Sequence, residues 1–313
     1  MEKFSVLMSI YKNENPEFLK ASLDSILENT VCPNEIVMVK DGPLSQELET
    51  VLNDYQKKTG LFHFVIHEKN LGLGIALRDG LLECKNELVA RMDTDDICCG
   101  DRFEKQLSFL NDNPDIAVVG SYVDEFQQDA SHPYSVIIFP TDDKAIRRFA
   151  KRRNPLKHPT VMFRKTAVIQ TGNYRHFLWI EDYDLCIRML LAGYKMANIP
   201  EILVHYRADA KLYGRRGGLK YLKQDLKFQK FMLYSGFIGR KEYVVNCLGR
   251  SAVRLMPNAL RAWVYRTFLR NSAKADTMST GGGHDSRTST HDEPCAGKSV
   301  WVTCLLPEWE ACA

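Results

Sequence analysis

The sequence predicts an α/β fold, in which a mostly parallel central sheet is flanked by helices and followed by a basic helical extension. Short apolar runs alternate with segments of helical periodicity through the first hundred residues. Polar residues follow each apolar run, and the composition becomes basic and aromatic after residue 210. Strands that alternate with helices are expected to lie parallel and to be joined by right-handed crossovers.

Four apolar runs in the first hundred residues are the expected parallel strands. Each run is short and is stopped by polar or turn-forming residues, such as Asp41, Gly42 and Pro43 after the second run. Between the runs, apolar residues recur at helical spacing, which predicts three connecting helices. The expected strands are residues 6–10, 35–40, 62–66 and 88–92, and the expected helices are residues 16–29, 46–58 and 74–84.

The rest of the main domain is less regular. A helix is expected at residues 102–110 and a strand at 117–122, with weaker strand candidates at 136–139 and 160–163. Residues 181–191 predict a helix that ends at Gly193, and residues 197–206 predict an extended segment that closes the domain. The expected main domain therefore covers residues 1–210.

Two segments of different composition follow the main domain. Residues 211–271 contain many Lys, Arg and aromatic residues but few acids, and they predict helices at 219–234, 240–255 and 258–269. Residues 272–313 contain Gly281, Gly282 and Gly283, many Ser and Thr, and little periodicity. We expect this tail to be disordered, or to be sequence foreign to the parent fold.

The composition of the 313 residues excludes several classes of protein. The net charge of +3 is too small to indicate a nucleic-acid partner. The cysteines lack the spacing of a zinc site and are expected to be reduced thiols. The amino terminus does not resemble a signal peptide, and no apolar run approaches the about 20 residues of a membrane-spanning helix. We expect a cytoplasmic protein whose membrane contact, if any, is peripheral.

The acidic cluster Asp93-Thr94-Asp95-Asp96 directly follows the fourth expected strand. Three crowded carboxylates repel one another unless a cation neutralises them, and carboxylate oxygens suit Mg²⁺ or Mn²⁺. The alternative is a solvated acidic turn or a helix N-cap. The position favours the metal site, because ligands of parallel α/β sheets bind at the carboxyl ends of the strands.

Two other strand ends carry polar residues that are expected to face the same site. Asp41 and Gly42 form either a plain turn or a site in which the carboxylate accepts a nucleobase N–H. The segment Asn70 to Gly74 is either a tight turn or a glycine-rich loop that opens a helix, from which Arg78 could face a diphosphate.

A third pair of acids, Glu181 and Asp182, begins an expected helix. Carboxylates are favoured in a first helical turn by the helix dipole, so a structural role is one interpretation. The other is catalytic, since a carboxylate can act as the general base that takes a proton from an acceptor hydroxyl.

In this order along the chain, the motifs resemble glycosyltransferase family 2, a large group of inverting enzymes with the GT-A (Rossmann-like) nucleotide-sugar fold. The resemblance covers residues 4–207. Its markers are Ser9 to Asn13, the Asp41-Gly42 pair, Asn70 to Gly74, Asp93 to Asp96, and Glu181 to Asp184.

The resemblance implies a role for each marker. Asp95, with Asp93, would bind a Mn²⁺ or Mg²⁺ ion that bridges the donor diphosphate, and Asp182 would be the catalytic base, with Glu181 beside it at the acceptor. His205 would be a weaker candidate for diphosphate contact. The residues implied to hold the nucleotide sugar are Ser9, Tyr11, Asp41, Arg78, Asp93, Asp96 and Arg207.

The resemblance also implies a substrate class. The chain is similar to bacterial enzymes of O-antigen and exopolysaccharide assembly, which implies transfer of Gal or Glc from a UDP-sugar. The implied acceptor is GlcNAc or GalNAc on diphosphoundecaprenol, with a β-1,3 linkage, at the cytoplasmic face of the inner membrane. Trp263, Tyr265 and Phe268 would suit an anionic membrane surface, although a helical cap with a solvated basic face is an equal alternative.

Two other functions are compatible with an acidic metal site on such a sheet. A sugar-phosphate nucleotidyltransferase would need a glycine-rich basic loop after the first strand, where this chain has Tyr11-Lys12-Asn13-Glu14-Asn15. An inactive scaffold of a polysaccharide assembly complex would not need the intact Asp95 and Asp182.

Overall fold

The computed structural model describes residues 2–208 and 218–256, and all structural statements concern these ranges. Four parallel strands lie in the order β3-β2-β1-β4, as the alternating pattern predicts. They are β1 (Phe4–Ile10), β2 (Glu35–Lys40), β3 (Phe62–Ile66) and β4 (Leu88–Arg91). The helices between them are α1 (Pro16–Leu27), α2 (Gln46–Thr59) and α3 (Leu73–Glu83).

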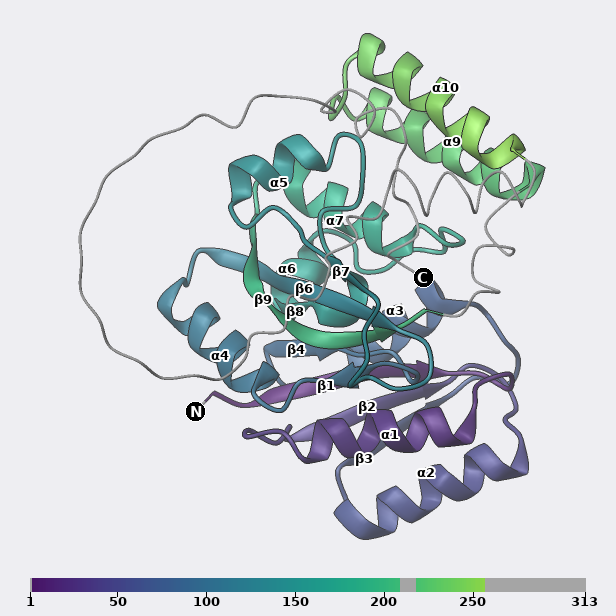
Figure 1. Ribbon diagram of the computed structural model, residues 1–313, viewed down its shortest axis with the longest axis vertical. Helices are drawn as coiled ribbons and strands as arrows, with labels where there is room; N and C mark the ends of the chain where they lie inside the picture. Colours follow the sequence, from purple (N-terminus) through teal and green to yellow (C-terminus); the bar gives the residue numbers. More distant parts are fainter. Residues whose placement is uncertain (1, 209–217, 257–313) are drawn as a thin grey trace.

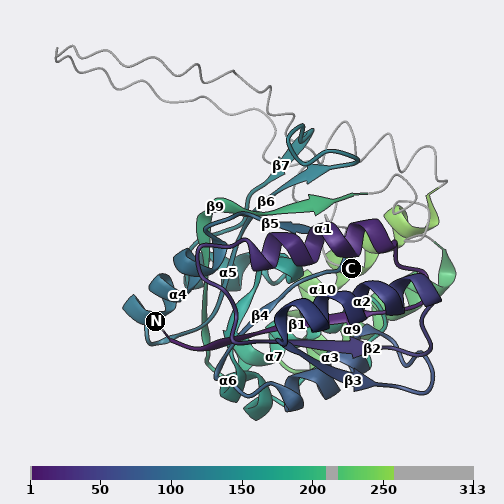
Figure 2. The same ribbon diagram turned by 90° about the horizontal axis from the view of Figure 1, so that it is seen from below.

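The helices cover both faces of this parallel part of the sheet (Figure 2). Successive side chains of a strand point to opposite faces, so neighbouring residues join different cores. Met8 and Met38 pack with residues of α1 and α2, whereas Leu7 and Val37 pack with residues of α3. Both faces are therefore buried, which explains why these strands are continuous apolar runs.

The second half of the sheet is mixed in direction. The strand β8 (Met162–Arg164) lies antiparallel between β4 and β6 (Ile116–Phe126), and β6 pairs in parallel with the long β9 (Lys195–Arg207). The short strands β5 (Ile97–Cys98) and β7 (Ser135–Ile137) add antiparallel edges to β9 and β6. This arrangement brings the end of β9 next to the acidic cluster that follows β4 (Figure 1).

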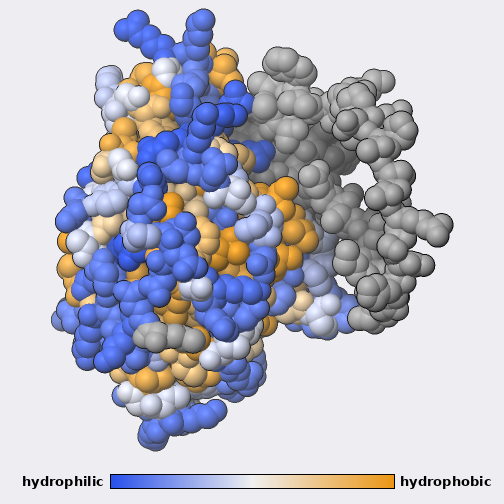
Figure 3. All heavy atoms as spheres, turned by 90° about the vertical axis from the view of Figure 1, so that its left-hand side faces the viewer, coloured by the Kyte–Doolittle hydropathy of each residue, from blue (hydrophilic) through white to orange (hydrophobic). Residues whose placement is uncertain are grey.

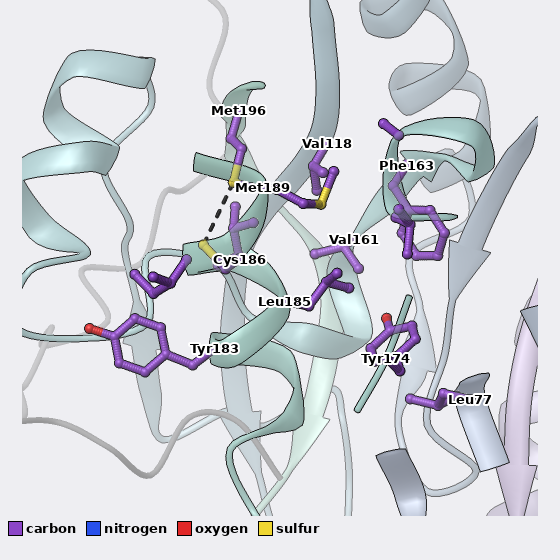
Figure 4. Packing of buried hydrophobic residues seen from close by; sticks show 14 of the residues in the cluster. Leu77, Val118, Val161, Phe163, Tyr174, Tyr183, Leu185, Cys186, Met189 and Met196 are labelled. Atoms are coloured by element: carbon purple, nitrogen blue, oxygen red, sulfur yellow. Dashed lines mark hydrogen bonds between the residues drawn. The ribbon is translucent and has the colours of Figure 1, made fainter. Parts of the chain in front are cut away.

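The remaining helices of the main domain are α4 (Arg102–Asp112), α5 (Asp143–Phe149), α6 (Lys165–Gln170) and α7 (Glu181–Leu191), with a 3₁₀ turn at His158–Thr160. The helix α7 is packed tightly against β6 and β9. Figure 4 shows its side chains Leu185, Cys186 and Met189 among residues of the sheet, with Cys186 Sγ 3.6 Å from Met196 Sδ. The burial of α7 fixes the position of the acids in its first turn.

The structure confirms the predicted fold class and most of the predicted elements. The strand β6 continues to Phe126, beyond the predicted end at residue 122, and tolerates register shifts against β9. Sequence periodicity did not reveal β5, α5, α6 or the 3₁₀ turn. These elements span seven residues or fewer, which is too short for a helical or strand period to be recognised.

The predicted basic extension contains the helices α9 (Leu219–Tyr234) and α10 (Arg240–Leu255), with the predicted bounds. They pack against each other at one end of the molecule (Figure 1). Phe228 of α9 contacts Phe177 and Tyr183 of the main domain, with ring centroids 5.6 and 4.8 Å apart. The predicted helix 258–269 and the tail 272–313 lie outside the described residues.

The surface has mixed hydropathy (Figure 3), and the helices show no membrane-spanning segment among the described residues. On the face drawn in Figure 3, hydrophilic side chains are interspersed with apolar ones. In residues 2–208 and 218–256, every helix is too short or too polar to cross a bilayer.

A buried ion cluster joins α9 to α10. The carboxylate of Asp225 is fully buried and lies 2.9 Å from Nε of Arg254 and 3.6 Å from Nη1 of Arg250. Replacing Asp225 by Asn is expected to lower the free energy of unfolding by about 3 to 5 kcal/mol, because two buried guanidinium groups lose their counter-charge. Urea unfolding followed by circular dichroism measures this loss.

The exposed Asp54 provides a matched control for the charge change. Asp54→Asn is expected to change the free energy of unfolding by less than about 0.5 kcal/mol. Equal stabilities of the two variants would contradict the role of Asp225.

Candidate active site

A pocket of about 500 Å³ opens at the carboxyl ends of the parallel strands. This volume is in the range of small-molecule sites. The pocket is lined by the ends of β1 and β4, the start of α3, the end of β9 and the segment before α7. Among the residues that line it are Ser9, Tyr11, Asn13, Phe18, Asn70, Gly72, Gly74, Asp93, Thr94, Asp95, His176, Phe177, Trp179, Glu181, Tyr206 and Arg207.

The pairing of β1 with β4 places the acidic cluster beside Ser9 and Tyr11. The two strands pair in parallel up to Leu7 and Arg91, and the N–H of Met92 donates to the carbonyl of Leu7 over 3.2 Å. The hydroxyl of Ser22 in α1 donates to the carbonyl of Asp93 over 2.9 Å. The backbone of the cluster is thus held by a strand on one side and a helix on the other.

Three carboxylates of the cluster are close enough to share one cation. One oxygen from each of Asp93, Asp95 and Asp96 lies within 4.8 Å of the others. Burial and the neighbouring charge of Asp93 raise the pKa of Asp95 to about 6. Burial, followed by the charges of Asp95 and Asp93, raises the pKa of Asp96 well above its ordinary value.

The donor set fits a hard divalent cation. Carboxylate oxygens are the preferred ligands of Mg²⁺ and Mn²⁺, and the buried Oδ2 of Asp96 has no hydrogen-bond partner within the described part of the chain. A cation would also relieve the repulsion that raises both pKa values. The cluster is therefore a candidate metal centre rather than a solvated turn.

Two arginines hold the acidic cluster from opposite sides. Arg91, which is almost fully buried, forms an ion pair with Asp93. Arg207 of β9 donates its backbone N–H to Oδ1 of Asp96 over 2.8 Å and its Nε–H to the carbonyl of Asp95 over 2.9 Å. Its guanidinium also lies 3.9 Å from the ring centre of Phe18. Arg207 thus forms part of the pocket wall, and its contact with the donor diphosphate stays a prediction, whereas sequence reasoning missed Arg91.

Asp41 lies next to the pocket but outside its lining. Its carboxylate accepts from the N–H groups of Leu71 and Gly72 over 2.8 and 2.9 Å, and it also contacts Nδ1 of His67 at 3.1 Å. Gly42 has a φ of +91°, and a Cβ there would stand 2.7 Å from the backbone N of Asn70. In this structure the Asp41-Gly42 pair therefore clamps the glycine-rich loop, and its nucleobase contact remains a prediction.

Two other predicted ligands do not line the pocket. Arg78 points its Nε–H to Asp79 over 2.7 Å on a partly exposed surface of α3. His205 lies between Asp124 and Cys99, at 2.8 Å from Oδ2 of Asp124. The hydrogen bond with Asp124 raises the pKa of His205 to about 10. The structure thus brings neither side chain into the pocket.

Glu181 lines the end of the pocket formed by the segment before α7, and Asp182 lies behind it. Burial and the charge of Asp182 raise the pKa of Glu181 to about 8. One oxygen of Asp182 accepts from Nδ2 of Asn154 over 2.8 Å, and the side chain borders a small inner cavity of about 30 Å³. The two acids thus have different surroundings: Glu181 favours its protonated form, and Asp182 is held by an amide.

An aromatic wall before α7 was not predicted as part of the site. Trp179 lines the pocket with a φ of +66°, a left-handed conformation that is costly for a tryptophan. Its ring stacks on Tyr221 of α9, with centroids 4.9 Å apart and planes 6° apart. The signal in the sequence was the aromatic run before Glu181, but only the tertiary structure shows what covers it.

The fold and the site together define a nucleotide-sugar transferase of the GT-A type, with an acidic cluster at one end of the pocket and Glu181 at the other. The chain belongs to glycosyl transferase family 2, whose family model matches residues 5–172. It is thus a glycosyltransferase of the hexosyl-transferring class.

Two curated relatives match nearly the whole of their own length. The chain is 39% identical to the amylovoran biosynthesis glycosyltransferase AmsE of Erwinia amylovora, over 84% of this chain and 97% of that protein. It is 35% identical to a UDP-Gal:α-D-GlcNAc-diphosphoundecaprenol β-1,3-galactosyltransferase of Escherichia coli, over 86% of this chain and 97% of that protein.

Solved structures of glycosyltransferases share the fold. The 1–349 fragment of TarS of S. aureus, in complex with UDP-GlcNAc, superposes with a TM-score of 0.62 at 15% identity, over 84% of this chain and 75% of that chain. A mannosyltransferase of Pyrobaculum calidifontis, in complex with GDP-Man and Mn²⁺, has a TM-score of 0.56 at 13% identity, over 85% of this chain and 75% of that chain. Both similarities concern the fold.

The raised pKa of Glu181 predicts a dependence of stability on pH. Between the ordinary value of 4.5 and about 8, the folded chain keeps a proton that the unfolded chain has lost. The contribution of Glu181 to stability therefore falls as the pH rises through this window. Glu181→Gln is expected to remove this loss, so that the variant gains stability relative to the parent protein from pH 5 to pH 8.

Urea unfolding at several pH values between 5 and 8 measures this difference. The exposed Glu104 supplies the control, because Glu104→Gln should leave the pH profile of the parent protein unchanged. A profile for Glu181→Gln that runs parallel to that of the parent protein would show that Glu181 is ionised in the folded state.

Proposed function

We propose that the protein transfers a hexose, Gal or Glc, from a UDP-sugar to a sugar carried on a lipid diphosphate, with inversion at the anomeric carbon. The observation that carries the proposal is the single pocket whose walls include Asp93 and Asp95 together with Glu181. A diphosphate needs a neutralising cation, and an acceptor hydroxyl needs a base. The lining of the pocket supplies carboxylates for the cation, and Asp182, which lies directly behind Glu181, is the acid proposed as the base.

The donor end of the proposed site is the wall formed by β1, β4 and β9. Ser9 and Tyr11 line the pocket beside the acidic cluster and are proposed to hold the uridine. Asp93, Asp95 and Asp96 would hold Mn²⁺ or Mg²⁺, which would neutralise the charge that develops on the leaving diphosphate. Arg207 fixes the cluster and adds a positive group at the wall. Asp41 supports this end indirectly by holding the loop at Gly72.

The acceptor end is the wall formed by the aromatic segment and the start of α7. Asp182 is proposed to take the proton from the acceptor hydroxyl as its oxygen attacks the anomeric carbon opposite the departing UDP. An α-linked donor then gives a β-linked product. Burial and the charge of Asp182 raise the pKa of Glu181 to about 8, so the protonated Glu181 would donate a hydrogen bond to the acceptor. Asn154 orients Asp182.

The nature of the acceptor rests on the relatives. One relative is named for transfer to GlcNAc on diphosphoundecaprenol and another for amylovoran biosynthesis. These names support a role in O-antigen or exopolysaccharide assembly for this chain, with a β-1,3 linkage to GlcNAc or GalNAc. A lipid-linked acceptor would place the enzyme at the cytoplasmic face of the inner membrane.

A panel of UDP-sugars tests the proposal directly. UDP-Gal and UDP-Glc are expected to donate to GlcNAc or GalNAc linked to a lipid diphosphate, and linkage analysis of the product should show a β-1,3 bond. UDP-GlcNAc is the comparison donor. Transfer only to acceptors without a lipid diphosphate would contradict the acceptor class, and formation of a UDP-sugar from UTP and a sugar phosphate would indicate a nucleotidyltransferase.

Loss of one carboxylate from the acidic cluster is expected to abolish transfer. Asp95→Ala removes a pocket-facing member of the candidate metal centre and should reduce turnover by at least about a thousandfold, because a bound cation contributes several kcal/mol. Binding of Mn²⁺ in the presence of UDP, measured by calorimetry, should be lost in parallel. Near-normal turnover with added Mn²⁺ would refute the metal assignment, and Asp54→Ala on the exposed face of α2 is the control.

The two acids at the start of α7 are expected to respond differently to neutralisation. Asp182→Asn should lower kcat by about 10² to 10⁴-fold with an unchanged KM for the UDP-sugar, because it removes the base. Glu181→Gln keeps a hydrogen-bond donor and should lower kcat by about tenfold or less. The reverse order of the two effects would make Glu181 the base.

A further inference from the structure

The exposed face of α9 is a row of lysines. Side chains that recur every three or four residues lie on the same face of a helix, and four lysines do so on α9, where Leu219 and Tyr234 are exposed as well. The one acid of this helix, Asp225, is buried against Arg254. The lysine row comprises Lys220, Lys223, Lys227 and Lys230.

The exposed face of α10 is an apolar row. Helices of globular proteins usually turn their apolar face to the core, but here large aliphatic side chains face outward. Val244 is 52% exposed, Leu248 is 67% exposed and Leu255 is 58% exposed. The apolar row comprises Val244, Val245, Leu248, Ala252 and Leu255, and the exposed Lys241 precedes it.

The two rows lie on helices that pack against each other, and neither helix has an exposed acid. The inner sides of the helices are joined by the Asp225 cluster and by a hydrogen bond of 2.8 Å between Asn246 and Gln229. Between residues 219 and 255 every exposed charged side chain is a Lys or Arg, since Asp225 is buried and Glu242 is half-buried in an ion pair with Lys151. A surface that combines cations with exposed aliphatic groups fits an anionic lipid interface.

The same helices also touch the wall of the pocket. Tyr221 of α9 stacks on Trp179, and Lys220 lies 5.5 Å from the ring centre of Trp179. Phe228 contacts Phe177, another residue of the pocket wall. A membrane held by α9 and α10 would therefore lie on an element in direct contact with the acceptor end of the pocket.

We propose that the lysine row of α9 and the apolar row of α10 form a docking surface for a membrane of anionic phospholipids. The cations bind the headgroups and the aliphatic side chains enter the interface. This inference rests on the proposed lipid-linked acceptor, because docking on this surface brings that acceptor to the Trp179 wall.

Two other occupants would use the apolar row alone. The chain continues beyond Leu255 with residues 257–313, and a segment of it could cover α10; a second copy of the protein could do the same. Neither accounts for the lysine row on the neighbouring helix, which has no exposed acid. A membrane would use both rows. Substitutions in the lysine row should therefore weaken binding of a membrane but not binding of the other two occupants.

Vesicle flotation of the full chain tests the docking surface. The purified protein is expected to float with vesicles of phosphatidylglycerol and phosphatidylcholine at low salt, and to float much less with phosphatidylcholine alone. Replacing Lys223, Lys230 and Lys241 by Gln is expected to weaken binding by about 100-fold, at about fivefold for each lysine near an anionic surface. The matched control replaces the exposed Lys57, Lys58 and Lys69 by Gln, and it should bind like the parent protein.

A second pair of variants tests the apolar row. Replacing Val244 and Leu248 by Ser is expected to weaken binding by about tenfold, including the part that survives high salt. The control replaces Ile66 and Leu82, which are also exposed but lie on β3 and α3, by Ser. Thermal unfolding shows whether each variant is folded. If the variants of the apolar row do not fold, the lysine variants still test the docking surface.

Sedimentation velocity and transfer assays separate the alternatives. If Val244→Ser and Leu248→Ser dissociate a dimer, or if neither row affects flotation, the membrane surface is refuted. The row variants should lose transfer to acceptor embedded in vesicles but keep transfer to a short-chain, water-soluble acceptor. Absence of transfer to either acceptor by the parent protein would refute the proposed function instead, while leaving the flotation result valid.

Discussion

The rest of the site depends on the crowding of three carboxylates at one side of the pocket, where Asp93 and Asp95 line the wall and Asp96 is buried behind it. Asp93, Asp95 and Asp96 repel one another in a poorly solvated place, and this raises the pKa values of Asp95 and Asp96. The fold offsets the repulsion with Arg91 from inside the sheet and with Arg207 from β9. Among the described residues, the buried Oδ2 of Asp96 has no hydrogen-bond partner, which makes the cluster suited to a bound cation.

The mixed half of the sheet also contributes residues to this pocket. The antiparallel β8 lets the chain pass from β4 to β6, and the parallel pairing of β6 with β9 then carries Arg207 back to the acids. The core around α7, shown in Figure 4, fixes the first turn of this helix, so that Glu181 lines the other end of the pocket and Asp182 lies behind it. The acids at the two ends of the pocket thus come from segments about ninety residues apart in the sequence.

The helices α9 and α10 connect this site to the outside of the molecule. Tyr221 and Phe228 support the aromatic wall, where Trp179 has a strained backbone. Strain of this kind persists only when the surroundings hold it in place. The buried Asp225 cluster fixes the two helices, so their exposed rows and the pocket wall form one connected unit.

The sequence by itself determined the parallel sheet, the bounds of α7, α9 and α10, and the presence of an acidic site, because these depend on local periodicity and on the order of strand ends. It could not show that Asp41 binds the loop at Gly72, that Arg78 pairs with Asp79, or that Glu181 rather than Asp182 lines the large pocket. Those outcomes depend on which groups meet after distant segments pack, and on how burial shifts the balance between charged and neutral forms. Only the tertiary structure decided them.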